Sequence, residues 1–405
     1  MIKKIPAEYI KPGMYIHDLN VDWMNHPFVR NRFVIQTDEE IAIITATGVR
    51  EIYIDTARGL DLADAPTLEE VNAELDADLL RIAEAPPMIV KVSYAEELGR
   101  AHRIHQQATN AVKTVMRDVR MGQAIQMDDV ANVVGDITES VLRNSGALVG
   151  LLAIKNKDEY TFLHSVSVCT LMVTFAQSLG MDRNLIRLAG IGGLLHDTGK
   201  MKVPNEILNK PGRLTEAEFD IMRSHPEEGW NILRQIDDME AIPLEITLHH
   251  HERMDGTGYP HKLPGNQISQ MAQMAAVVDV YDAITSDRCY HVGMPATEGL
   301  RKLWEWSKFH FNPELVQAFM RTIGIYPVGS LVRLESGRLG IVIEQNEGSL
   351  LQPKLKVIFS SKANTYITPT IIDLSKSMGQ GGADKIMGHE DPAKWQINIA
   401  RFLLP

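Results

Sequence analysis

The stretch from His249 to Pro260 constrains this chain more than any other. It holds three consecutive histidines, two carboxylates and an arginine, and it closes on the tripeptide Gly258, Tyr259 and Pro260. Imidazole and carboxylate groups together are ligands of hard-to-borderline divalent metal ions. Glycine and proline after these side chains predict that the chain turns sharply just past them. The stretch therefore predicts a metal site beside a tight loop.

A second cluster of the same chemistry, His196 and Asp197, lies upstream at the expected end of an apolar helix. Adjacent residues diverge by about 100 degrees around a helix, so one imidazole and one carboxylate fan out from one point. This suits an aspartate that bridges two metals while the histidine serves one of them. Alone, such a dipeptide is more often a helix end with a satisfied histidine. In this apolar setting, however, an unpaired carboxylate would cost several kcal/mol.

Three further segments each contribute one candidate ligand. His164 lies in an apolar helix, where the alternative is a hydrogen-bonded core histidine. His225 opens the next helical region, where the alternative is a surface histidine. Asp279 lies in an apolar run, where the alternative is a structural ion pair. Together these candidates favour a metal site more strongly than each does alone, because they come one per predicted helix in a chain with 14 histidines.

Composition and charge narrow the class of protein. A chain of 405 residues, 44% apolar and 23% charged, is typical of a globular protein of about two or three domains. We expect no membrane span and no secretory signal. With only two cysteines we expect neither disulfides nor a cysteine metal site, and we place the protein in the cytoplasm. The formal charge of −11 argues against a nucleic-acid polymer as partner.

The residue pattern predicts several domains. Short apolar runs predict a small β-rich domain over residues 1–66, with a short helix near 38–47. Thr67 and Glu70 form a capping box that predicts a helix over 68–84, stopped by two prolines, within a helical linker region over 67–145. An all-α domain is expected over 146–326, with helices at 161–179, 184–197, 215–222, 225–236, 240–251, 269–286, 296–305 and 312–322. A small β region is expected over 327–405, with a loose tail after Met378.

Residues 94–150 carry a second helical pattern. Val130, Val133, Val134, Ile137 and Val141 recur at three- and four-residue spacing and mark one apolar helix face. That face supports either a homodimer or packing within the chain.

The ordered series of histidines and aspartates also resembles a known family. His196 and Asp197 with Gly199 and Lys200, then His225 and the stretch 250–260, look like the HD-GYP subgroup of the HD metal-dependent phosphohydrolases. The resemblance covers about residues 150–325. Residues 1–130 resemble the domain often found ahead of bacterial HD-GYP modules, on segments 11–16 and 25–28. A multidomain protein is thus implied, with an all-α HD-type helical catalytic domain flanked by a small β-rich N-terminal domain and a small β C-terminal appendage.

The resemblance implies hydrolysis of the bacterial messenger cyclic di-GMP to pGpG, and in some members on to GMP. It implies two divalent metal ions, and ligation by nitrogen and oxygen alone favours iron or manganese. The implied metal ligands are His164, His196, Asp197, His225, His250, His251 and Asp279. The implied catalytic residues are Asp197 and Lys200, and the implied substrate-binding residues are Lys200, Arg288, Gly258, Tyr259 and Pro260.

Two-metal chemistry predicts in-line attack of an activated water on a phosphodiester phosphorus, with Lys200 and Arg288 stabilising the oxygens that gain charge. The loop of residues 258–260 is expected to wall the pocket and to offer a contact for diguanylate cyclase proteins; the alternative is a simple tight turn. His249, which precedes the matched pair, is expected to be a non-ligating neighbour.

Two positions depart from the family pattern. Members with a third metal carry glutamate four residues before the first histidine, where this chain has Tyr160, so we expect two metals. The segment from Arg288 to His291 departs from the commoner Arg-Pro-Tyr, and a frequent lysine is His291 here. Phosphate binding there is expected to be weaker or pH-dependent.

Two other functions compete with the phosphodiesterase. One is a receptor that binds cyclic di-GMP with negligible turnover, which the departures at Tyr160 and His291 leave open. The other is a generic HD phosphohydrolase of a mononucleotide or alarmone. The Gly-Tyr-Pro loop, the additional histidines and Arg288 argue against that second alternative.

Overall fold

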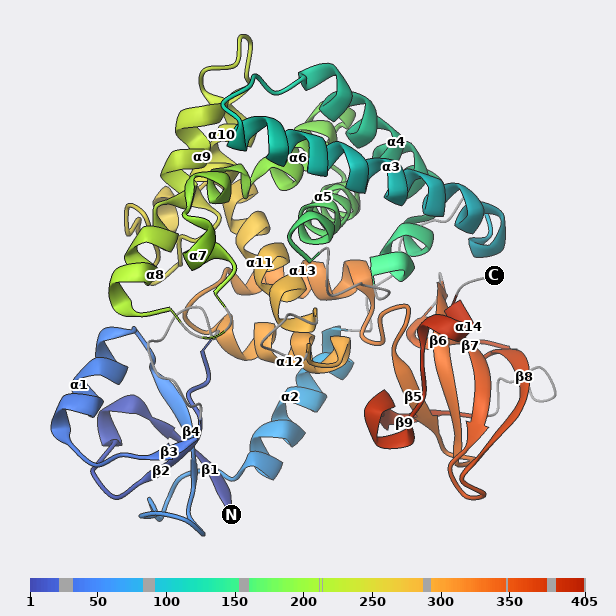
Figure 1. Ribbon diagram of the computed structural model, residues 1–405. Coiled ribbons are helices and arrows are strands. Elements are labelled where there is room, and N and C mark those ends of the chain that lie inside the picture. Colours follow the sequence, from blue (N-terminus) through green and yellow to red (C-terminus); the bar gives the residue numbers. More distant parts are fainter. Residues whose placement is uncertain are drawn as a thin grey trace. The chain divides into compact units, whose positions relative to one another are not determined.

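The structure is a computed structural model that describes residues 1–21, 32–82, 92–152, 160–210, 212, 214–286, 293–346, 349–376 and 384–403, without the side chains of residues 160 and 161. The chain divides into two units, Met1–Leu80 with Asn205–Ile221, and Arg81–Pro204 with Met222–Pro405. No helix in the described ranges is long and apolar enough to cross a membrane. The expected fold class is confirmed, because a small β-sheet domain, a helical domain and a C-terminal sheet are all present (Figure 1).

Alternating apolar residues build the N-terminal sheet. Its antiparallel strands lie in the order β1 (Ile2–Pro6), β4 (Glu51–Asp55), β2 (Tyr15–Asp18) and β3 (Phe33–Val34). Their inward-facing isoleucines form the core. Helix α1 (Asp38–Ala46) begins after its N-cap, Thr37, and confirms the short helix near 38–47. Strand β1 was missed by the sequence pattern, and residues 25–28 lie outside the described ranges.

Local capping sets where the next helix begins. In α2 (Leu68–Ile82), the backbone N–H of Thr67 donates to Glu70 at 2.8 Å, and the Glu70 N–H donates back to the Thr67 hydroxyl at 3.2 Å. This reciprocal pair satisfies amides that have no partner within the helix. The capping box predicted from Thr67 and Glu70 is confirmed. The two prolines expected to stop the helix lie outside the described ranges.

The helical domain follows the predicted pattern closely. Its longest helices, α3 (Tyr94–Arg120) and α4 (Met127–Leu152), pack on each other, and α4 also packs on α5 and α6. The predicted apolar face is used within the chain, since Val130, Val134 and Ile137 are fully buried. The other helices of this unit are α5 (Tyr160–Ser178), α6 (Arg183–Leu195), α9 (His225–Leu233), α10 (Ala241–His249), α11 (Gln270–Thr285), α12 (Ala296–Trp306) and α13 (Pro313–Ile323). Helix α7 (Asn205–Leu208) and most of α8 (Glu216–Arg223) belong to the unit that contains Met1–Leu80.

Gly199 allows the turn that follows α6 to lie directly against α9. After α6 the chain continues as a 3-10 turn, η4 (Thr198–Lys202). A Cβ on Gly199 would overlap the carbonyl oxygen of His225 and the amide nitrogen of Gly229, which are both backbone atoms of α9. Only glycine lets the turn lie against α9. The contact brings His196 and Asp197 close to His225.

The C-terminal region is a five-stranded antiparallel sheet in the order β8, β7, β6, β5, β9. These strands are β5 (Leu331–Leu334), β6 (Arg338–Asn346), β7 (Ser349–Ser360), β8 (Thr365–Asp373) and β9 (Ile386–His389). The prediction of a loose tail after Met378 is wrong for residues 384–403. There β9 pairs with β5, and Ile397 and Leu403 are buried in the core of the sheet. The tail is ordered because its apolar side chains bury against distant strands.

Candidate metal centre

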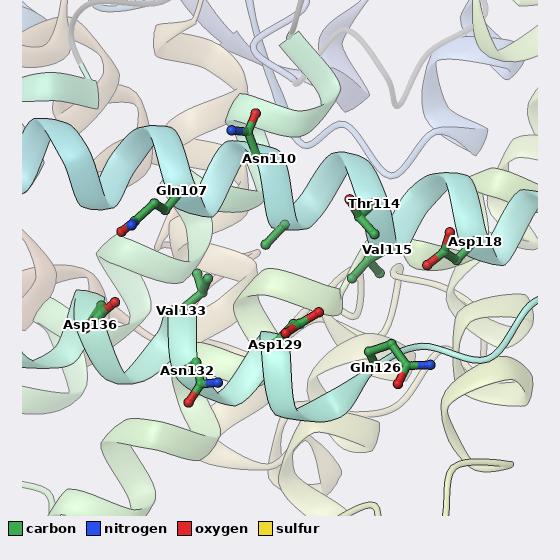
Figure 2. A pocket seen from close by; sticks show the side chains of 11 residues that line it. Gln107, Asn110, Thr114, Val115, Asp118, Gln126, Asp129, Asn132, Val133 and Asp136 are labelled. Carbon is green, nitrogen blue, oxygen red and sulfur yellow. The ribbon is translucent and has the colours of Figure 1, made fainter.

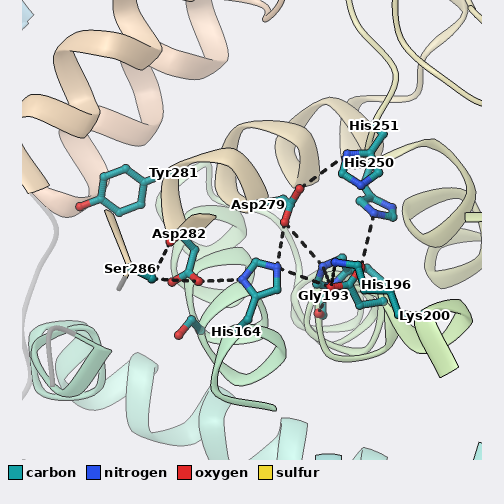
Figure 3. A network of polar contacts seen from close by, with 12 residues as sticks. His164, Gly193, His196, Lys200, His250, His251, Asp279, Tyr281, Asp282 and Ser286 are labelled. Carbon is teal, nitrogen blue, oxygen red and sulfur yellow. Dashed lines mark hydrogen bonds and ion pairs between the residues drawn. The ribbon is translucent and has the colours of Figure 1, made fainter. Parts of the chain in front are cut away.

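Segments in or directly after α5, α6, α9, α10 and α11 bring all seven predicted ligands together. Figure 3 labels five of them, His164, His196, His250, His251 and Asp279. Six of them are at most 3% exposed, and the side chain of His251 is 9% exposed. Buried imidazoles and carboxylates are unusual unless they are paired or bind a metal. The seven residues are His164, His196, Asp197, His225, His250, His251 and Asp279.

The donor atoms fall into two groups. His164, His196 and Asp279 form one group, and within it the donor atoms lie no more than 4.8 Å apart. His225, His250 and His251 form the other group under the same limit. We call these the first and second donor groups. Each has the size and chemistry of a site for one divalent cation.

Asp197 lies between the two donor groups. Its Oδ2 atom is 3.4 Å from His196 Nε2 and 3.7 Å from His164 Nε2, both in the first group. Its Oδ1 atom is 3.4 Å from His225 Nε2 and 3.9 Å from His250 Nε2, both in the second group. One carboxylate therefore directs one oxygen to each group, as a bridging ligand requires.

Asp279 also faces both groups. Its Oδ1 atom lies 2.9 Å from His164 Nε2, and its Oδ2 atom lies 3.8 Å from His251 Nδ1. The acidic side chain that was unusual in an apolar helix is thus surrounded by imidazoles.

Backbone carbonyls orient three of the imidazoles. The Nδ1 atoms of His196, His225 and His250 lie 2.8, 2.8 and 2.9 Å from the carbonyl oxygens of Gly193, Met222 and Thr247. A carbonyl oxygen can only accept, so each Nδ1 carries a hydrogen, and in the neutral form of each ring Nε2 keeps its lone pair. Those lone pairs face the cluster, which is the arrangement that metal-binding histidines adopt.

Asp282 orients the fourth imidazole and was given no role from the sequence. Its Oδ2 atom lies 2.7 Å from Nδ1 of His164, and its side chain is buried (Figure 3). The signal was its spacing, because Asp279 and Asp282 stand three residues apart on α11 and share one face of the helix. Asp279 faces Nε2 of His164 and Asp282 faces Nδ1, so the ring is held between them.

The carboxylates set the charge of the first group. Burial acts to lower the pKa of His196, but Asp197 and Asp279 outweigh it and raise that pKa to about 10. Burial acts in the opposite direction on Asp197, yet His196 and Lys200 hold its pKa well below the usual range. The pKa of Asp279 is also well below its usual range. Both carboxylates are therefore ionised, which is their ligating form.

The second group is neutral. Burial lowers the pKa of His225 to about 3, and the positive charge of Lys200 adds to this effect. Burial also lowers the pKa of His250 to about 4 and moves the pKa of His251 well below its usual value. Neutral imidazole is the form that binds metal ions.

Several buried donor atoms have no hydrogen-bond partner in the described part of the chain. They include Nε2 of His196, Oδ1 of Asp197 and Oδ2 of Asp279. A buried polar atom without a partner costs about 1–3 kcal/mol. Because these atoms converge between the two donor groups, the residues present fit divalent cations.

The predicted catalytic and substrate-binding residues lie around this centre. Lys200 Nζ is 2.6 Å from Asp197 Oδ2, and the Lys200 side chain is 16% exposed. The ring of Tyr259 stacks on His251 with 4.6 Å between centroids. Gly258 allows this fold, since a Cβ there would overlap backbone atoms of residues 251–253, and the Tyr259–Pro260 bond is cis. Arg288 lies outside the described residues.

A separate cavity of about 370 Å³ lies between α3 and α4 (Figure 2). Three carboxylates, Asp118, Asp129 and Asp136, line it together with amide and apolar side chains. It contains none of the predicted site residues.

The chain matches two known families along its length. Residues 2–130 match a domain of unknown function (DUF3391), and residues 151–315 match the HD domain. Cyclic di-GMP phosphodiesterase PA4108 of Pseudomonas aeruginosa is 44% identical over 398 residues, covering 98% of this chain and 94% of that protein.

Other relatives match a shorter part of the chain. A cyclic di-GMP phosphodiesterase of Thermotoga maritima is 37% identical over 166 residues, covering 41% of this chain and 45% of that protein. The 3'3'-cGAMP-specific phosphodiesterase 3 of Vibrio cholerae is 33% identical over 174 residues, covering 42% of this chain and 37% of that protein. The resemblance seen in the sequence is confirmed by the likeness to the Pseudomonas protein over nearly the full length. This chain belongs to the HD-GYP family of cyclic di-GMP phosphodiesterases.

Proposed function

We propose that this protein hydrolyses cyclic di-GMP to linear pGpG at a centre of two divalent cations. The observation that carries the proposal is the position of Asp197, whose two carboxylate oxygens face two different groups of histidines. Cyclic di-GMP is favoured as substrate because the Pseudomonas relative, 44% identical, is named for that activity.

The two donor groups divide the ligands. His164, His196 and Asp279 would hold one cation, and His225, His250 and His251 would hold the other. Asp197 would bridge them. Donors that are all nitrogen or oxygen favour iron or manganese. When bound, such cations polarise a phosphate oxygen and lower the pKa of a water molecule.

Lys200 and the loop of residues 258–260 would act on the substrate directly. The Lys200 ammonium lies beside Asp197 and is partly exposed, so it can compensate the charge that develops on the phosphate oxygens. Tyr259 packs on His251 and gives the second donor group an aromatic wall. Arg288 is proposed as a further phosphate ligand from the family match alone.

The decisive experiment is metal analysis with product identification on anaerobically purified protein. Cyclic di-GMP, 3'3'-cGAMP and a mononucleotide are supplied in parallel with manganese or ferrous iron. Formation of pGpG with about two cations per chain supports the proposal. Binding of cyclic di-GMP without pGpG would instead make the protein a receptor. Turnover of the mononucleotide alone would make it a generic HD phosphohydrolase.

Other features of the proposal rest on the sequence alone. A further cut of pGpG to GMP, a cytoplasmic location and the four-part division at residues 66, 145 and 326 stay predictions. So do a homodimer and a contact of residues 258–260 with diguanylate cyclase proteins. Light scattering of the purified chain measures whether it forms a homodimer.

A further inference from the structure

Another group of potential metal ligands lies outside the proposed two-metal centre. His249, Glu252 and His261 each offer one donor atom, and the three atoms lie within 4.8 Å of one another. His249 is the last residue of α10, and Glu252 and His261 stand on either side of the Gly-Tyr-Pro turn. We call these three residues the outer group.

Glu252 is a buried carboxylate with no opposing charge of its own. It is 2% exposed, and its oxygens accept the backbone N–H groups of His261 at 2.7 Å and Leu263 at 3.0 Å. Across the residues that the structure describes, Glu252 forms no salt bridge. Removing a carboxylate from water without a cation is costly, even when amides donate to it. The position therefore favours a cation.

The two histidines supply the nitrogen donors. Nδ1 of His249 is buried and has no hydrogen-bond partner among the described residues. The rings of His249 and His261 lie 5.5 Å apart, centroid to centroid, at 58 degrees. Glu227 Oε1 lies 3.6 Å from Nε2 of His261, where it can hold that ring in place. An unsatisfied nitrogen and an uncompensated carboxylate thus lie in one small cluster.

We propose that His249, Glu252 and His261 bind one Zn²⁺ ion, which ties the end of α10 to the loop after Pro260. Two imidazoles, one carboxylate and a water in the fourth position form a common tetrahedral zinc site. Residues 252–263 carry Gly258, Tyr259 and Pro260 between the ligands. The ion would therefore fix the loop that stacks Tyr259 on His251. This site is separate from the two-metal centre, and its test does not depend on turnover.

The test counts zinc in chelator-treated protein that is reloaded with Zn²⁺ and desalted. Asp197→Ala serves as the background, because it disables the two-metal centre. We expect this background to keep about one zinc per chain that His261→Ala removes. His102→Ala, a change at an exposed histidine of α3, should leave the zinc content of the background unchanged.

Hydrogen exchange over residues 252–263 gives a second readout. Zn²⁺ should slow exchange of this loop in the Asp197→Ala background and have no effect once His261→Ala is added. Equal zinc content with and without His261, or no protection of the loop by zinc, would overturn the proposal. If the two-metal centre were wrong instead, Asp197→Ala would hold as much zinc as the native chain, and His261→Ala would still remove one ion.

Discussion

The two-metal centre and the outer group use the same kinds of side chain but are built differently. The centre collects its donors from five segments that are helices or directly follow them, and carbonyls or Asp282 hold four of its five imidazoles. The outer group takes all its donors from residues 249–261, most of them in a loop, and the His261 side chain is 45% exposed. The first arrangement is preorganised by packing, whereas the second is held mainly by the hydrogen bonds that Glu252 accepts, and the proposed cation would add a link between α10 and the loop.

The largest effect is expected from Asp197→Ala. The change removes both oxygens that link the donor groups, so both cations should be lost and turnover should fall by roughly 10³-fold or more. Metal analysis and a cyclic di-GMP assay measure this, with the exposed Asp237→Ala as control. Substantial retained activity would remove the bridging role.

The neighbouring residues His249 and His250 test the comparison between the two-metal centre and the outer group most directly. His250→Ala should strip metal from the two-metal centre and lower turnover by roughly 100-fold or more, because it removes a ligand of the second donor group. His249→Ala should leave the metal content of that centre intact and remove only the outer zinc. Matched metal analysis of the two variants decides this, and equal losses would mean that the two sites are not separate.

Asp282→Asn should have an intermediate effect. The amide can still hydrogen-bond to His164 but lacks the charge that makes the imidazole a better donor, so metal affinity should fall by about 10–100-fold. Titration of the metal-free protein with Mn²⁺ measures the affinity. An unchanged affinity would show that the hydrogen bond to His164 is enough without the negative charge of Asp282.

Tyr160→Glu should have the smallest effect on the existing centre. Residue 160 opens α5 and stands one turn before His164, so a carboxylate there would be directed along the same helix face. We expect a third cation with the first two retained. A count that stays at two would show that the departure at Tyr160 does not limit the number of metals.

Much of this arrangement was predictable because it depends on local sequence. Helix boundaries follow caps and apolar spacing, and the bounds of α5 and α12 lie within one residue of the predicted ones. The ligand set was implied by the resemblance to the HD-GYP family, and the fold brings its seven residues together. That β9 would form an ordered strand was not predictable, because it forms by pairing with β5, which lies far away along the chain. Neither was the proposed role of His249, because it depends on Glu252 and His261, which only the folded loop brings close to it.

The glycine at position 199 acts as a spacer of fixed width. With hydrogen as its side chain it brings the turn after α6 against the backbone of α9, and Asp197 then reaches His225 at 3.4 Å. The side chain of any other residue would push the two segments apart and separate the donor groups. The spacing of the two donor groups thus depends on a residue that would bind neither cation.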